Sequence, residues 1–206
     1  MAVIRSNERI SGRPDERRNR NFSGRKCIIC DNERALLRLF QKQIKFQCDC
    51  VLIAERELED AIAQKDITAI FCAIQSLLGS AANISKALWG VRKTKNALAA
   101  RAPLRDSLQV SDASPLNPRE MRNNYEHFDE RLDKWWEQSK NHNFMDMGLM
   151  TRKAIQGLAD IERFRAYDPA TGDLTFWGDD MNLLALLNEV RRIHPIVAAE
   201  AEKPHW

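Results

Sequence analysis

Apolar residues recur at helical spacing along two long segments in the first half of the chain. The first covers residues 35–64, which hold no Gly or Pro, and the second covers residues 67–89. Both patterns predict helices. Asp66 can cap the start of the second helix, and Gly90 marks its end. Because only residues 64–66 link the two helices, we expect an antiparallel hairpin.

A well-marked helix start follows a loop at residues 110–116. Asn117 can cap the helix, Pro118 suits its first position, and Glu120 can reach back to the cap amide. We expect this helix to run without interruption to about Lys140.

Weaker helical patterns fill much of the remaining chain. Residues 91–108 predict a helical segment that Pro103 interrupts, and residues 149–158 predict a short helix. A last helix is expected over residues 181–202, and Pro195 must kink or shorten it.

Residues 161–177 have a different pattern. Apolar and polar residues alternate on both sides of a turn that contains Pro169 and Gly172, which is typical of a β-hairpin. The predicted fold is therefore all-α: an antiparallel helical bundle with a small β-hairpin appended near residues 161–177.

The helix predicted over residues 118–140 has two distinct faces. One stripe, about 100° wide on a helical wheel, holds all of its large apolar residues, which are Met121, Tyr125, Phe128, Leu132, Trp135 and Trp136. We expect this stripe to face the bundle core. The opposite half holds polar residues, which are Arg122, Asn123, Glu126, His127 and Glu130. These side chains can therefore take part in catalysis or simply contact the solvent.

The distribution of charge sets the first residues apart from the rest. Residues 1–26 carry eight Lys or Arg and three Asp or Glu, a net charge of +5, whereas the whole chain carries +3. We expect residues 1–28 to form a basic, disordered tail and residues 29–206 to form one helical domain. The tail is equally well explained as a phosphate-binding arm and as a solvated leader.

The sequence predicts a cytoplasmic protein that does not enter a membrane. It opens without an apolar stretch of secretory type, and no apolar run approaches the ~20 residues that cross a bilayer. The five cysteines, an odd number, favour reduced thiols.

A zinc site is the alternative interpretation of four of these cysteines. Cys27 and Cys30 have the spacing of a zinc knuckle, whereas Cys48 and Cys50 fall in a predicted helix. Residues i and i+2 of a helix diverge by about 200° and cannot share a metal. We therefore expect no metal and no cofactor.

Residues 122–127 read Arg-Asn-Asn-Tyr-Glu-His. They resemble the R-x4-6-H motif of the HEPN superfamily, in which Asn is a favoured residue after the Arg. Residues 80–89 and 127–135 are similar to the abortive-infection branch of that superfamily. The resemblance covers about residues 32–200.

The resemblance implies a ribonuclease that needs no metal, in which a ribose 2′-hydroxyl attacks the adjacent phosphate. His127 would act as general acid or base, Arg122 would bind the phosphate and the transition state, and Asn123 would position the substrate. The candidates for substrate binding are Asn124, Glu126 and Arg131.

The resemblance also implies RNA as a partner, a homodimer and, for a toxin or anti-phage protein, a cognate antitoxin. One helix supplies one histidine, whereas this reaction uses both a base and an acid. A twofold dimer would bring two copies of His127 and of Arg122 into one cleft.

Two positions in or beside the motif count against an active nuclease. In the toxin branch a tyrosine two residues after the His is the target of modification, and here Asp129 stands at that position. Glu126 lies four residues after Arg122 and can pair with it. The alternative is therefore a catalytically silent HEPN dimer that binds RNA, a nucleotide or a protein partner.

Overall fold

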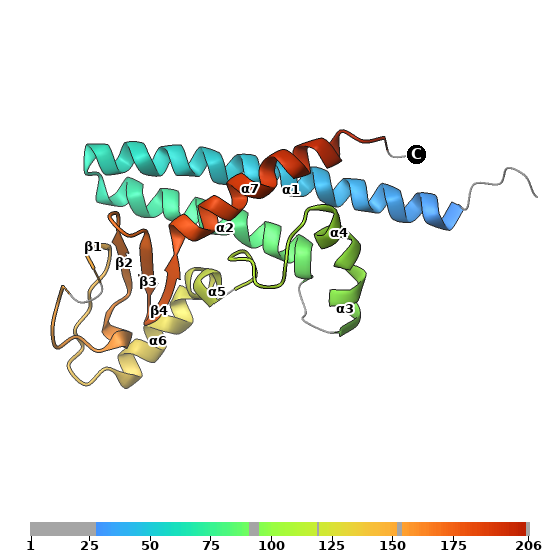
Figure 1. Cartoon of the computed structure of the whole chain (residues 1–206). Helices are drawn as coiled ribbons and strands as arrows, with labels where there is room; N and C mark the ends of the chain where they lie inside the picture. The colour runs from blue at the N-terminus through green and yellow to red at the C-terminus, as the bar shows by residue number, and fades with distance from the viewer. Residues whose placement is uncertain (1–27, 91–94, 119, 152–153, 205–206) are drawn as a thin grey trace, which may run out of the picture.

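The two long helices form the antiparallel hairpin that their periodicity predicts in the computed structural model (Figure 1). α1 covers Ile28–Gln64 and α2 covers Ile67–Trp89. The Asp66 side chain caps α2 by accepting a hydrogen bond from the amide of Ala69 at 3.0 Å. Gly90 ends α2 with φ 75°, a conformation that glycine adopts without strain. The hairpin and both of its end signals are confirmed.

The structure describes residues 28–90, 95–118, 120–151 and 154–204. Within the helices it leaves the side chains of residues 28–32, 95, 97 and 120–122 undescribed. The predicted basic tail and the cysteine at position 27 lie outside the described residues.

A third long helix completes the bundle. α7, Leu183–Ala201, packs along α1 and buries Val190, Ile193 and Val197 completely. Ion pairs flank this contact, among them Arg38 with Glu200 at 2.9 Å. α7 continues through Pro195 to its end at Ala201. Of the two predicted effects of this proline, a kink or a shortened helix, the shortening is therefore wrong. The packing of the helix on α1 outweighs the one backbone hydrogen bond that a proline removes.

The segment after α2 folds into two short helices and a loop. α3 covers Lys95–Ala100 and α4 covers Ala102–Ser107, with Pro103 in the first turn of α4. A proline in that position starts a helix instead of breaking one. The break predicted near Pro103 is thus real and falls just before it, at Arg101.

The predicted β-hairpin is part of a small mixed sheet with strand order β1-β2-β3-β4. The strands are β1 Gly148–Leu149, β2 Arg165–Asp168, β3 Asp173–Phe176 and β4 Asp179–Asn182, and a 3-10 turn, η1, covers Asp160–Glu162. β2 and β3 pair antiparallel from Arg165 opposite Phe176 to Asp168 opposite Asp173. The hairpin is confirmed, and the chain is mostly helical with one small sheet.

Two expectations beside the hairpin are wrong. Residues 149–158 form no helix in their described part, because the backbone at Leu149 pairs in parallel with Tyr167 of β2. The last helix, expected from residue 181, begins at Leu183 with Asn182 as its cap, because Asp179–Asn182 form β4. In both places long-range strand pairing overrides a local helical preference.

α2 is the most apolar long helix that the structure describes. Its 23 residues include a stretch with mean hydropathy 1.6, long enough and apolar enough by composition to cross a membrane. Half of that stretch is buried inside the protein, where α2 packs against α1 and supplies core residues such as Ile74 and Leu77. The expectation that no apolar run approaches the length of a bilayer crossing is therefore wrong for α2. The place of α2 as the central helix of the bundle accounts for its composition.

Candidate functional site

The helix predicted over residues 118–140 is broken at His127. α5 covers Glu120–Glu126 and α6 covers Phe128–Gln138. His127 between them has φ −116° and ψ 42°, outside the helical region. Its amide still donates to the carbonyl of Asn123 at 2.9 Å. The uninterrupted helix was therefore a wrong prediction, and the candidate histidine occupies the junction.

The break separates the predicted apolar stripe into two parts. Tyr125 and Leu132 pack against the core, as the stripe predicts. Phe128 is 55% exposed and Trp136 is 66% exposed, and α6 has no buried residue. The expectation that the whole stripe faces the core is wrong, because α6 packs mainly against η1 and α5.

A buried asparagine just before the break ties α5 to the sheet and to α6. Asn124 is 0% exposed, and its amide nitrogen donates to the Phe176 carbonyl at 3.1 Å and to Asp179 Oδ2 at 2.8 Å. Its amide oxygen accepts a hydrogen bond from Arg131 Nε at 2.9 Å. Because a buried amide without partners costs about 1–3 kcal/mol, this network sets how α5 lies against the sheet.

The same network fixes Arg131 on α6. Besides its bond to Asn124, its guanidinium stacks over the ring of Trp177, 4.8 Å from the ring centre. Asn124 and Arg131 thus join α5, α6 and the β3–β4 turn into one unit. The structure brings these two candidate substrate-binding residues together, with Asn124 buried and Arg131 half-buried, where they support the junction.

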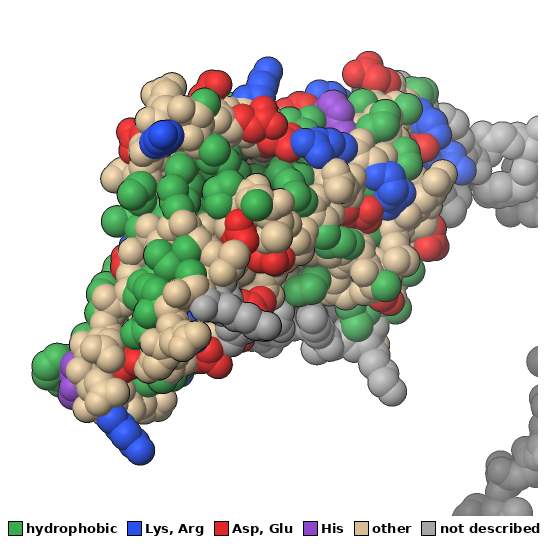
Figure 2. All heavy atoms as spheres, turned by 60° about the vertical axis from the view of Figure 1, so that its left-hand side comes forward, with side chains coloured by type: hydrophobic (Ala, Val, Ile, Leu, Met, Phe, Trp, Pro, Cys, Tyr) green, Lys and Arg blue, Asp and Glu red, His purple; other side chains and the backbone are tan. Residues whose placement is uncertain are grey.

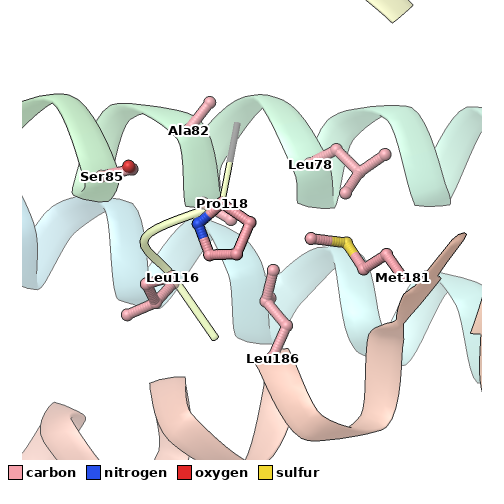
Figure 3. A pocket seen from close by; sticks show the side chains of 8 residues that line it. Leu78, Ala82, Ser85, Leu116, Pro118, Met181 and Leu186 are labelled. Carbon is pink, nitrogen blue, oxygen red and sulfur yellow. The ribbon is translucent and has the colours of Figure 1, made fainter. Parts of the chain in front are cut away.

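Side chains from three parts of the chain hold the start of this region in place. Figure 3 shows Leu116 and Pro118, just before α5, inserted between α2 and the segment of Met181 and Leu186. The gap between them is only about 10 Å³, room for about one water molecule. Asn117 does not cap α5 in the predicted way, since its amide donates to the Asp112 carbonyl at 2.8 Å. This pocket is a packing contact that positions α5.

The imidazole of His127 lies at the surface. Its side chain is more than half exposed, and Nδ1 is 3.5 Å from Oε1 of Glu130, one turn further along α6. The Glu130 carboxylate therefore faces Nδ1, and Nε2 lies on the far side of the ring. The ring is accessible to a ligand in solution.

The other polar residues of the motif have different surroundings. Glu126 is about half exposed, and its carboxylate is 3.8 Å from Lys86 Nζ on α2. Asn123 is half-buried. Arg122 has its backbone in α5, but its side chain lies outside the described residues. Its place beside His127 and its pairing with Glu126 therefore remain predictions.

A cavity of about 210 Å³ opens next to this junction. It is lined by Gln75 from α2, Arg165 from β2 and four aromatic rings, which are Tyr125, Phe128, Phe164 and Phe176. The Tyr125 ring stacks on Phe176 at 4.6 Å, and burial raises the pKa of its hydroxyl above the ordinary value. That hydroxyl is buried and has no hydrogen-bond partner among the described residues.

Arg165 is the charged residue of this cavity. Its guanidinium forms two hydrogen bonds with the Asp146 carboxylate, one of them 2.7 Å long. These hydrogen bonds raise the pKa of the Arg165 guanidinium above its ordinary value. Sequence reasoning missed Gln75 and Arg165, because they come from separate elements and neither belongs to a recognisable motif. The alternation of residues in the hairpin was the one signal for Arg165.

Aromatic side chains continue outward from the cavity along α6. Phe144 lies 5.0 Å from Phe164 and 5.2 Å from Trp135, and His142 lies 4.5 Å from Trp136. Figure 2 shows hydrophobic side chains and a histidine at this outer end of the molecule. We call Trp135, Trp136, His142 and Phe144 the aromatic surface of α6.

Cysteine and histidine positions in the described residues show no metal site. Cys48 and Cys50 both lie in α1, as predicted, with Cys48 fully buried. Across the described parts of the chain, no group of three or more His, Cys, Asp or Glu residues is placed to hold a metal ion. The pair Cys27 and Cys30 is not included in this statement, because neither side chain is described.

Comparison of the chain with known proteins adds no assignment. No family model matches it, and no match was found among curated proteins or among solved structures. The fold and the junction at His127 are therefore the basis for any statement of function.

Proposed function

We propose that the chain is a metal-independent RNA endonuclease of the HEPN type whose active site forms between two copies. The observation that carries the proposal is the position of His127, an exposed imidazole at a helix junction beside a cavity with aromatic walls. Arg122 precedes it on α5, as in the R-x4-6-H motif. The long antiparallel hairpin before the motif is further support.

The proposed reaction is an internal transfer at phosphorus. A 2′-hydroxyl oxygen bonds to the adjacent phosphorus, and the bond from phosphorus to the 5′-oxygen breaks. One His127 takes the proton of the hydroxyl, and the partner subunit's His127 gives a proton to the leaving oxygen. The guanidinium of Arg122 neutralises charge on the non-bridging oxygens. The products are a 2′,3′-cyclic phosphate and a 5′-hydroxyl.

The surroundings of His127 suit a flexible single strand of RNA. The aromatic cavity beside it offers ring faces on which a nucleobase can stack, and such stacking is worth about 1–3 kcal/mol per base. Phe128, the residue after His127, is both exposed and part of the cavity lining. It therefore lies where a base next to the cleaved phosphate would stack.

One observation favours the silent dimer as a second candidate. Asp129 and Glu130 are exposed next to His127, and the Glu130 carboxylate is 3.5 Å from its ring. Carboxylates in this position repel RNA phosphates. In the silent dimer the junction binds a partner and cleaves nothing.

Cleavage of a single-stranded RNA in the presence of EDTA tests the proposal. We expect wild type to cut and to leave 2′,3′-cyclic phosphate ends. Arg122→Ala and His127→Ala should each lower the rate at least about 100-fold, the low end for loss of an acid–base group. Asp133→Ala, at another exposed position of α6, is the matched control and should cut like wild type.

Two checks make the result decisive. Circular dichroism and thermal melting must show that each variant keeps the wild-type fold. If wild type does not cleave, or if all variants cleave equally, the nuclease proposal is wrong. Binding of uncut RNA by wild type would then favour the silent dimer.

A further inference from the structure

The outer face of α1 carries a regular row of exposed apolar side chains. Leu36, Leu39, Phe46 and Ile53 are 47–58% exposed; we call them the α1 stripe. With Gln43 and Cys50 between them, the steps along the chain are 3, 4, 3, 4 and 3 residues. This alternation is the heptad spacing by which one helix pairs with another.

Among the described residues, neither α2 nor α7 covers the α1 stripe. α1 sends Ile44, Cys48 and Val51 into the core, where all three are fully buried. Gln47 faces α2, and Asp49 binds His194 of α7 at 2.7 Å. At about 100° per residue, the stripe lies on the side of α1 away from α2 and α7, and its N-terminal end borders α4. Such a row of large apolar side chains is typical of an interface.

Charge along α1 identifies the partner helix. Residues 33–46 carry four basic side chains and one acidic one, whereas residues 47–60 carry five acidic and one basic. An antiparallel pair of these helices sets each basic half against an acidic half, and a parallel pair would set like charges together. The natural complement of α1 is therefore α1 of a second copy.

We infer that two copies of this chain associate through the α1 stripe as an antiparallel, twofold-symmetric helix pair. The heptad spacing sets the register, with Leu36 opposite Ile53 of the partner subunit and Leu39 opposite Cys50 of the partner subunit. Lys42 then flanks the pair on the same side as Asp49 of the partner subunit. The twofold axis repeats each of these contacts.

The surface available is sufficient for a stable pair. Half-exposed side chains of this size leave on the order of 100 Å² each, so the two stripes together remove roughly 800 Å² of apolar surface. A hollow of about 660 Å³, lined by Leu36, Phe40 and Leu104 among others, continues the stripe at its N-terminal end. Specific interfaces bury about 1,200–2,000 Å² in total, so the residues that flank the two stripes would supply the remainder.

This interface is separate from the one that the proposed nuclease needs. In Figure 1, α2 lies between α1 and the region of α5, α6 and the sheet. Pairing through α1 therefore leaves both His127 junctions on the outside of the dimer. The inference does not depend on the nuclease proposal, and either can fail without the other.

Light scattering with size-exclusion chromatography of the full chain tests the inference. We expect wild type to be a dimer at micromolar concentration, and a larger assembly if the His127 junctions pair as well. Phe46→Glu should weaken association through the α1 stripe at least about 100-fold and lower the mass, because it places one carboxylate of each copy between the two apolar stripes. Ile67→Glu, a change of similar exposure at the start of α2, is the control and should leave the mass unchanged. A monomeric wild type, or a Phe46→Glu protein of wild-type mass, would overturn the inference.

A cross-link gives an independent measurement that does not rely on a disruptive variant. In a background with Cys27, Cys30 and Cys72 changed to Ser, Leu39→Cys should form a dimer linked to the native Cys50 on mild oxidation. The protein that keeps Leu39 in the same background should not form a cross-linked dimer. Efficient linkage through Cys50 alone would indicate a parallel pair and contradict the antiparallel register.

Discussion

The helical bundle and the α5–α6 region differ in what determines their structure. α1, α2 and α7 bury periodic apolar faces against one another, and Ile44, Ile74 and Val190 are fully buried. α5 and α6 have equally periodic apolar residues, yet the helix breaks at His127 and α6 buries none of its side chains. In the second region a buried polar group, Asn124, links α5, α6 and the sheet by hydrogen bonds. The candidate site lies where polar contacts decide the geometry.

The largest expected loss of stability comes from a cavity created in the helical bundle. Ile74→Ala removes a completely buried side chain of α2 and should lower the free energy of unfolding by about 2–5 kcal/mol. Urea denaturation followed by circular dichroism measures the change. A loss under about 1 kcal/mol would show that the bundle is less tightly packed than its burial indicates.

The next largest loss of stability should be confined to the α5–α6 region and the adjoining sheet, and should leave the helical bundle unchanged. Asn124→Ala leaves Asp179 and Arg131 without their buried partner and should cost about 1–3 kcal/mol. Hydrogen exchange should accelerate in α5, α6 and β3–β4 and stay unchanged in α1 and α2. Asn141→Ala, at an exposed position, is the control. Equal acceleration throughout the chain would contradict a local role for Asn124.

A smaller effect depends on pH. Hydrogen bonds from the Ser139 hydroxyl and the Ala159 amide hold the pKa of Glu162 below its usual range. Since the folded pKa is lowered, the carboxylate stabilises the fold above its unfolded pKa, and this contribution is lost as pH falls through the lower folded value. Glu162→Gln should therefore be less stable than wild type at pH 7.

The difference between Glu162→Gln and wild type should shrink when urea unfolding is repeated below about pH 4, near the ordinary pKa of a glutamate. A difference that stays constant from pH 7 to pH 3 would mean that the carboxylate charge has no part in the contact with Ser139.

The smallest effect is expected at the aromatic surface of α6. Trp136 is 66% exposed, so Trp136→Ala should change the free energy of unfolding by no more than about 0.5 kcal/mol. A core tryptophan would cost about 3–5 kcal/mol instead. Thermal melting distinguishes the two, and a large loss would restore the predicted apolar stripe of residues 118–140.

The sequence predicted those elements that are determined by residues close together in the chain. The α1–α2 hairpin follows from periodicity, Asp66 and Gly90, and the β2–β3 hairpin follows from alternation around the turn at Gly172. β4 could not be predicted, because three of its four residues are polar and exposed and because it forms a strand only by pairing with β3.

The same limit applies to the candidate site. The motif around His127 is visible in the sequence, and its exposure is consistent with the polar half of the wheel. The break at His127 could not be predicted, since no Gly or Pro stands there and the partners of Asn124 are 52 and 55 residues further along the chain. Nothing local indicates that this asparagine is buried.

The most direct test of the central claim is the chemistry of the RNA ends. Wild type and His127→Ala are incubated with one single-stranded RNA in EDTA, and the new termini are identified by mass spectrometry. The proposal predicts 2′,3′-cyclic phosphate and 5′-hydroxyl ends for wild type and at least about 100-fold less of both for the variant. Intact RNA with wild type, or equal cleavage by the two proteins, would contradict it.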